Sequence, residues 1–127
     1  MTPIADSERY LNLATFKRSG AQVNTPVWFA MQDAHYYIFS ARNAGKVKRV
    51  RNSPSARIAA CDMRGNLTGN WLEARCRIAD DEAEQLAYAL LLKKYGWQMQ
   101  VTNFFSRLSG KIHNRIVLVV SLEDGES

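Results

Sequence analysis

The residues best suited to bind a ligand lie in one basic stretch, which runs from Phe39 to Pro54. Its residue order is typical of a strand end, a turn of small residues and a short helix that stops before the proline. Backbone N–H groups at the start of such a helix have no intrahelical partner and bind anions. Lys46, Lys48 and Arg49 add full positive charges there. The stretch predicts a phosphate site, and a solvated basic helix that covers one end of a barrel is the alternative interpretation.

Most of the excess positive charge of the chain lies in this region. The sequence has 17 Lys and Arg against 12 Asp and Glu, which gives a formal net charge of +5. No acidic residue occurs among the basic residues Arg42, Lys46, Lys48, Arg49, Arg51 and Arg57. We therefore expect an anionic partner, which could be a nucleotide-like cofactor, a nucleic acid or a membrane surface.

Catalysis by side chains has little support in the sequence. There is no GxSxG, HExxH or P-loop motif, and His35 and His113 stand at predicted strand starts without metal ligands nearby. Cys61 and Cys76 fall on neighbouring predicted strands, where they could approach each other, but we interpret them as small buried residues. We predict no catalytic side chain and no metal site, so any chemistry would come from a bound cofactor.

The number of cysteines also indicates the cellular compartment of the protein. They are too few for a disulfide framework, and the sequence has no uncharged apolar run long enough to cross a membrane. The first residues do not resemble a signal peptide. These features favour a cytoplasmic protein without a membrane span.

The order of the predicted strands and helices around the basic stretch favours one α+β domain, residues 1–127, built on an antiparallel barrel. A meander of three strands comes first, and a capping box of Asp81 and Glu84 opens a later helix that Gly96 ends. The predicted strands are Tyr10–Phe16, Gln22–Met31, His35–Ser40, Ser55–Asp62, Trp71–Ala79 and His113–Leu122, and a further helical piece is Trp97–Leu108.

Pro26 interrupts the second predicted strand. Because it has no N–H to donate, its strand must be an edge, a bulge or a place where the ladder opens for a ligand. Trp28, Trp71 and Trp97 stand at element edges, where an aromatic ring can meet a ligand or a partner chain. Together with the basic helix, these residues suit a flat aromatic ligand that carries a phosphate.

With these pieces in hand, the chain resembles the split-barrel flavoproteins of the pyridoxamine phosphate oxidase-like superfamily, and within it the deazaflavin-dependent (F-420) branch. The resemblance runs from about Arg9 to Leu122. The matching segments are Tyr10–Phe16, Asn24–Phe29, Ser40–Arg49, Asn52–Pro54, Arg57–Asp62 and Arg64-Gly65.

This resemblance implies a six-stranded antiparallel split β-barrel that acts as a homodimer, with two cofactors at the interface. It places the cofactor ring along Thr25, Pro26, Val27 and Trp28, and the phosphate at Ser40, Arg42, Lys46, Val47 and Lys48. The partner subunit would close the site, and Trp71 and Trp97 are candidates for that role.

The cofactor and the reaction stay open at this point. Family members bind FMN, deazaflavin or haem, and Arg49, Arg51 and Arg57 would suit the polyglutamate tail of the deazaflavin coenzyme. The Arg-rich C-terminal motif of true pyridoxamine phosphate oxidases is absent from Val119–Gly125, so vitamin B6 oxidation is not expected. We expect an FMN- or deazaflavin-dependent oxidoreductase with a small-molecule substrate. The alternatives are a protein that stores or senses a cofactor and a barrel that binds nucleic acid.

Overall fold

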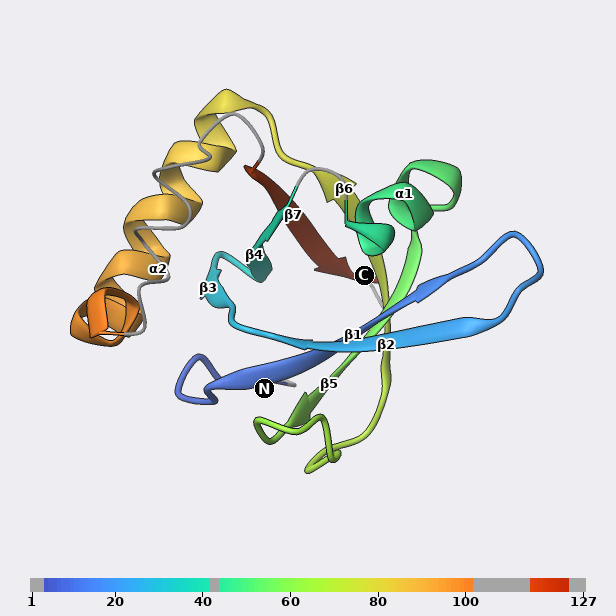
Figure 1. Ribbon diagram of the computed structural model, residues 1–127, viewed down its shortest axis with the longest axis horizontal. Helices are drawn as coiled ribbons and strands as arrows, with labels where there is room; N and C mark the ends of the chain where they lie inside the picture. Colours follow the sequence, from blue (N-terminus) through green and yellow to red (C-terminus); the bar gives the residue numbers. More distant parts are fainter. Residues whose placement is uncertain (1–3, 42–43, 102–114, 124–127) are drawn as a thin grey trace.

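The computed structural model describes residues 4–41, 44–101 and 115–123, and these residues form one curled antiparallel sheet with two helices (Figure 1). The strand order in the sheet is β2-β1-β5-β6-β7-β4-β3. The elements are β1 Tyr10–Phe16, β2 Gln22–Val27, β3 Ala30–Gln32, β4 His35–Ala41, α1 Gly45–Asn52, β5 Ser55–Cys61, β6 Leu72–Ile78, α2 Asp81–Val101 and β7 Arg115–Leu122.

The two edges of the sheet, β2 and β3, are consecutive in the chain. Val27 is the last residue of β2 paired with β1, and Ala30 is the first residue of β3 paired with β4. Only Trp28 and Phe29 lie between them, so the sheet curls until its two edges nearly meet. The predicted single strand Gln22–Met31 is therefore divided, and the described residues form seven strands where six were expected.

Pro26 lies on β2, an edge strand, which is one of the three positions that the sequence allowed for it. Both predicted hairpins form, since β2 pairs with β1 and β3 pairs with β4, but the break in the second predicted strand places the two hairpins at opposite edges of the sheet. The α+β antiparallel split barrel itself is confirmed.

The barrel interior holds the main hydrophobic core. Leu11, Leu13, Ile38, Ile58 and Leu118 are fully buried there and come from four different strands. Helix α1 packs onto this core through Val50, whereas α2 lies on the outer face of β4 and β7, where it covers Tyr37 and Val117.

Strand β6 alternates between the core and the solvent. Ala74 and Cys76 point into the core, and Glu73, Arg75 and Arg77 are exposed. The same period places Ile58 and Ala60 of β5 in the core and Cys61 on the other face of the sheet.

The two cysteines therefore lie on opposite faces, and the expectation that they could approach each other is wrong. Both thiols are buried, as predicted. Burial raises the pKa of Cys61 to about 11 and that of Cys76 to about 12, so both stay protonated and unreactive near neutral pH.

Helix α2 begins and bends where the sequence indicated, with one correction. The Asp80 side chain accepts a hydrogen bond from the Ala83 N–H at 2.9 Å, so the cap is one residue earlier than the predicted Asp81. Gly96 has φ 37° and ψ −115° and breaks the helix, which resumes as far as Val101. The rest of the helical piece predicted to reach Leu108 lies outside the described residues, as does His113. Within the described ranges, neither helix is long and apolar enough to cross a membrane.

Candidate cofactor site

A pocket of about 290 Å³ opens where the two edges of the sheet meet helix α2. Its walls are mainly aromatic and aliphatic, and they come from β1, β2, the β2–β3 link, β4 and α2. The lining residues are Tyr10, Pro26, Val27, Trp28, Phe39 and Leu91. A pocket with these walls suits a flat apolar ring, since small-molecule sites are concave and mostly apolar.

The wall at Trp28 is backed by a second aromatic ring. The Trp28 and Tyr95 rings are stacked with centroids 4.3 Å apart and an interplanar angle of 4°. Tyr95 is 2% exposed and belongs to a small hydrophobic cluster with Ala30 and Leu91. This cluster fixes α2 against the break between β2 and β3.

Helix α1 lies at another place on the barrel and is tied to β1. The Arg49 side chain donates from Nε to Thr15 Oγ1 at 2.6 Å and folds back along the helix. A Cβ at position 45 would lie 2.8 Å from Arg49 Nη1, so Gly45 leaves room for this guanidinium beside the first turn. A second cation is thus fixed next to Lys46.

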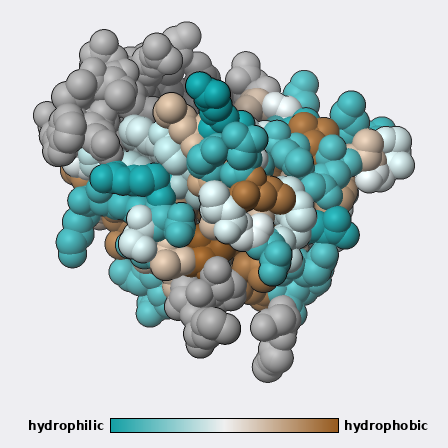
Figure 2. Space-filling view, turned by 90° about the horizontal axis from the view of Figure 1, so that it is seen from below, coloured by the Kyte–Doolittle hydropathy of each residue, from teal (hydrophilic) through white to brown (hydrophobic). Residues whose placement is uncertain are grey.

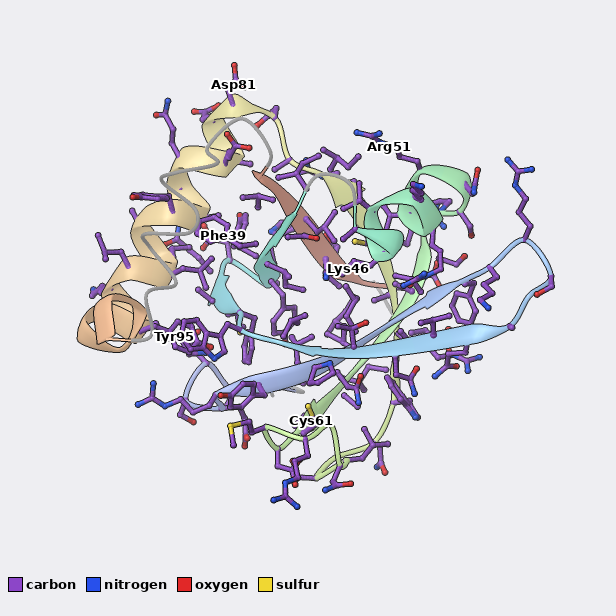
Figure 3. All side chains as sticks on the ribbon, in the orientation of Figure 1. Phe39, Lys46, Arg51, Cys61, Asp81 and Tyr95 are labelled. Atoms are coloured by element: carbon purple, nitrogen blue, oxygen red, sulfur yellow. The ribbon has the colours of Figure 1, made fainter. Side chains whose placement is uncertain are left out.

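The environment of Lys46 is that of a partly desolvated cation. Burial, followed by repulsion from Arg49, lowers the pKa of Lys46 below its ordinary value. Figure 3 shows the Lys46 side chain pointing toward the middle of the molecule, whereas Arg51 points outward. The N-cap residue Ala44 supplies no side-chain hydrogen bond to the helix. An anion bound here would relieve the repulsion between the two cations.

The structure brings together part of the predicted ring site. Pro26, Val27 and Trp28 line the pocket, but Thr25, one residue earlier, is not among the lining residues. Ser40 is buried at the end of β4, directly after the lining residue Phe39.

The predicted phosphate residues on α1 differ in exposure. Lys46 is half-buried, Lys48 is exposed, and Val47 is fully buried and packs inward. The Val47 N–H already donates to the Ala44 carbonyl at 3.1 Å. Arg42 lies outside the described residues, so its predicted role stays a prediction.

Trp71 is not among the lining residues of this pocket. It is half-buried and precedes Leu72, which packs against the barrel core, so its side chain starts on the outer face of β6. The side chain of Trp97 lies outside the described residues. The predicted role of both residues at a partner subunit stays a prediction.

Four residues of the site escaped the sequence reasoning, namely Tyr10, Phe39, Leu91 and Tyr95. Tyr95 is 66 residues from its hydrogen-bond partner Phe29, and no local pattern reveals such a pair. The aromatic residues Tyr10 and Phe39 offered only a weak signal, because large rings are as common in cores as at interfaces.

The described residues contain no group of three or more His, Cys, Asp or Glu side chains that could hold a metal ion. The pocket walls include no histidine, cysteine or carboxylate. His35 lies near Tyr37, with ring centroids 6.4 Å apart, and does not line the pocket. The residues around the pocket can bind and orient a ligand, but they offer little acid–base chemistry.

Among the residues that the structure describes, two large apolar side chains are exposed. Met63 and Leu67, in the loop between β5 and β6, are 67% and 44% exposed. The face in Figure 2 is mainly hydrophilic, with small hydrophobic patches.

Comparison with known proteins bears on the family. A family model described as pyridoxamine 5'-phosphate oxidase matches residues 2–127. No curated protein matches the chain.

Several solved structures share the fold. The haem storage protein HutZ from Vibrio cholerae has a TM-score of 0.71 and 15% identity, over 94% of this chain and 84% of that chain. An FAD-binding protein from Mesorhizobium loti has a TM-score of 0.63 and 19% identity, over 94% and 82%. An F-420 reductase has a TM-score of 0.57 and 17% identity, over 93% and 89%. At such low identities these likenesses show the fold alone.

Proposed function

The chain belongs to the pyridoxamine 5'-phosphate oxidase family, and we propose that it is an oxidoreductase that uses FMN, or alternatively the deazaflavin coenzyme F-420. Its substrate would be a small molecule. The observation that carries the proposal is the aromatic pocket at Pro26–Trp28, on the same barrel as the basic helix α1. Either cofactor, when bound, supplies hydride or electron transfer.

The pocket residues would hold the cofactor ring. Pro26 and Val27 offer an apolar strand edge, and Trp28 offers an aromatic wall held by Tyr95. Such walls exclude water and favour flat π systems. The residues around the ring would bind and orient it rather than exchange protons with it.

Helix α1 would hold the phosphate. Lys46 and Lys48 supply charge, and Arg49 adds a third cation fixed by Thr15. Charge-assisted hydrogen bonds to phosphate are about twice as strong as neutral ones. Ser40 and Arg42, which precede the helix, complete the set that we propose.

A homodimer would complete the site. The pocket volume of about 290 Å³ lies at the lower end of the range for small-molecule sites, roughly 300 to 1,000 Å³. One chain therefore supplies only part of the enclosure that a cofactor and its substrate need. We propose that a second copy supplies the rest, with Trp71 and Trp97 as its candidate contacts.

FMN is the first choice between the two cofactors. Arg57 forms an ion pair with Glu73 at 2.8 Å and also donates to Gln22, and Arg49 donates to Thr15. Arg57 is thus engaged in an ion pair within the chain, whereas Arg49 keeps its charge for either cofactor. This engagement weakens the argument for the deazaflavin coenzyme.

A second candidate function is binding of a cofactor without turnover. It is favoured by the lack of acid–base side chains among the described lining residues. Nucleic-acid binding ranks below both, because the basic residues lie on a helix and not along the strands where bases would stack.

The test is a titration of the purified protein with FMN, F-420 and haem, followed by absorbance and fluorescence. We expect micromolar or tighter binding of FMN, and a dimer in sedimentation at the same concentration. Binding of neither flavin in that range contradicts the proposal. Steep salt-dependent binding of an oligonucleotide in its place would favour the nucleic-acid function. Reduction assays with bound cofactor then separate an enzyme from a storage protein.

A further inference from the structure

Tyr95 satisfies the backbone at the break in the sheet. Its hydroxyl accepts a hydrogen bond from the Phe29 N–H at 3.1 Å. The same oxygen lies 2.7 Å from the Arg9 carbonyl and 3.0 Å from the Phe29 carbonyl, and it donates its single proton toward these acceptors. Phe29 belongs to neither β2 nor β3, so a side chain from α2 replaces the strand partner that it lacks.

These contacts lie in a buried place. Phe29 is fully buried, and Tyr95 is 2% exposed. A buried N–H or carbonyl without a partner is energetically costly, so the hydroxyl restricts where the chain at residue 29 can lie. Burial also raises the pKa of Tyr95, which keeps the hydroxyl protonated and able to donate.

The Tyr95 ring performs a second task on the neighbouring residue. It stacks face to face on Trp28 at 4.3 Å. The Arg9 guanidinium and the Lys94 ammonium lie 5.8 and 5.3 Å from the centre of the Tyr95 ring. Cations at such distances are attracted to an aromatic ring and limit its movement.

We propose that Tyr95 is the positioning residue of the ring site, because it fixes both the backbone at Phe29 and the indole of Trp28 that forms the pocket wall. This inference rests on the proposed function for the identity of the ligand. The order of Trp28 itself can be tested without any ligand.

The test combines two measurements on Tyr95→Phe, which keeps the ring and removes the hydroxyl. Trp28 becomes the only tryptophan in a Trp71→Phe/Trp97→Phe background, where acrylamide quenching and anisotropy report its mobility. FMN affinity is measured in the natural background. We expect Trp28 to become more mobile and the FMN dissociation constant to rise about three- to tenfold.

Tyr36→Phe is the matched control. Tyr36 is also fully buried and donates its hydroxyl to a backbone carbonyl, that of Ile4 at 3.1 Å, but it lies inside the barrel. This variant should lose stability without changing Trp28 mobility or FMN affinity. A second variant, Tyr95→Leu, removes the stack as well and should increase Trp28 mobility further.

Unchanged Trp28 mobility in Tyr95→Phe, or an equal change in Tyr36→Phe, would overturn the inference. If the natural protein binds no FMN, the proposed function fails, but the mobility of Trp28 still decides the role of Tyr95.

Discussion

Helix α1 and the Trp28–Tyr95 junction are held in place by different forces. The helix packs on the barrel through Val47 and Val50, presents most of its charges toward solvent, and is tied to β1 by the bond from Arg49 to Thr15. The junction is buried and has three hydrogen-bond contacts at one hydroxyl as well as a ring stack. The helix should therefore bind through electrostatics that salt screens, whereas the junction should bind through shape and stacking that salt hardly affects.

The difference assigns separate tasks to the two regions. Charge on an exposed helix attracts an anion but selects poorly among anions. A rigid aromatic wall selects for ring shape but gives no long-range attraction. A ligand that uses both must carry an anionic group and a flat ring, which is the chemistry of a flavin phosphate.

The largest expected effect comes from removing positive charge from helix α1. Lys46→Ala with Lys48→Ala removes two charge-assisted hydrogen bonds and should weaken FMN binding by roughly 2 to 5 kcal/mol. Isothermal titration at low salt measures this loss.

The control for that variant is Lys17→Ala with Lys93→Ala. It removes the same charge from two exposed lysines, one in the β1–β2 turn and one on α2. Equal losses of FMN affinity in the two double variants would rule out α1 as the phosphate site.

The anchor of α1 gives the next effect. Thr15→Val keeps the side-chain shape but removes the oxygen that accepts from Arg49, and Thr15 is 1% exposed. We expect about 1 to 3 kcal/mol less stability in urea unfolding. The exposed Thr68→Val should change stability by no more than about 0.5 kcal/mol. An equally small change for Thr15→Val would mean that the bond does not hold the helix.

The lowered pKa of Lys46 makes both the stability of the fold and the binding of phosphate depend on pH. Because the pKa of Lys46 is lowered in the folded protein, Lys46 loses its proton at a lower pH than an ordinary lysine. Between the pKa of Lys46 in the folded protein and that in the unfolded chain, the unfolded chain binds more protons. The contribution of Lys46 to the stability of the fold therefore rises with pH in this alkaline range.

Phosphate affinity should fall over the same alkaline range, because only the charged form of Lys46 attracts the anion. Lys46→Met should abolish this slope, while riboflavin, which has the ring but no phosphate, should show no slope with either protein. A slope that survives in Lys46→Met must come from another group.

The smallest effect lies far from both regions, at the turn between β3 and β4. Asp33 and Ala34 have φ values of 54° and 67°, as a two-residue hairpin turn requires. In this left-handed region the backbone of an alanine is strained, whereas that of a glycine is not. Ala34→Gly should therefore raise stability by about 0.5 kcal/mol, measured by thermal unfolding, with FMN affinity unchanged. A loss of stability would show that the strain at Ala34 is negligible.

The sequence predicted the regions that depend on local signals. The basic helix before Pro54 and the strand Trp71–Ala79 are each predictable from a few neighbouring residues. The family resemblance added Pro26, Val27 and Trp28, which line the pocket. The division of the predicted strand Gln22–Met31 into β2 and β3 could not be predicted, because it depends on which other strand pairs with each half.

Tyr95 shows the same limit at the level of a side chain. In the sequence it is one aromatic residue of a helical stripe, next to Gly96. Its role follows from contacts with Phe29 and Arg9, which are 66 and 86 residues away. Such contacts depend on how α2 is placed against the barrel, which no short pattern determines.

The most direct test asks whether the two regions bind one ligand. It compares the affinities of FMN and riboflavin in the natural protein and in the Lys46→Ala/Lys48→Ala variant. We predict that the natural protein prefers FMN by about thirtyfold or more, that the variant keeps only a small part of this preference, and that both proteins bind riboflavin with the same affinity. A preference for FMN that is the same in both proteins would contradict the account.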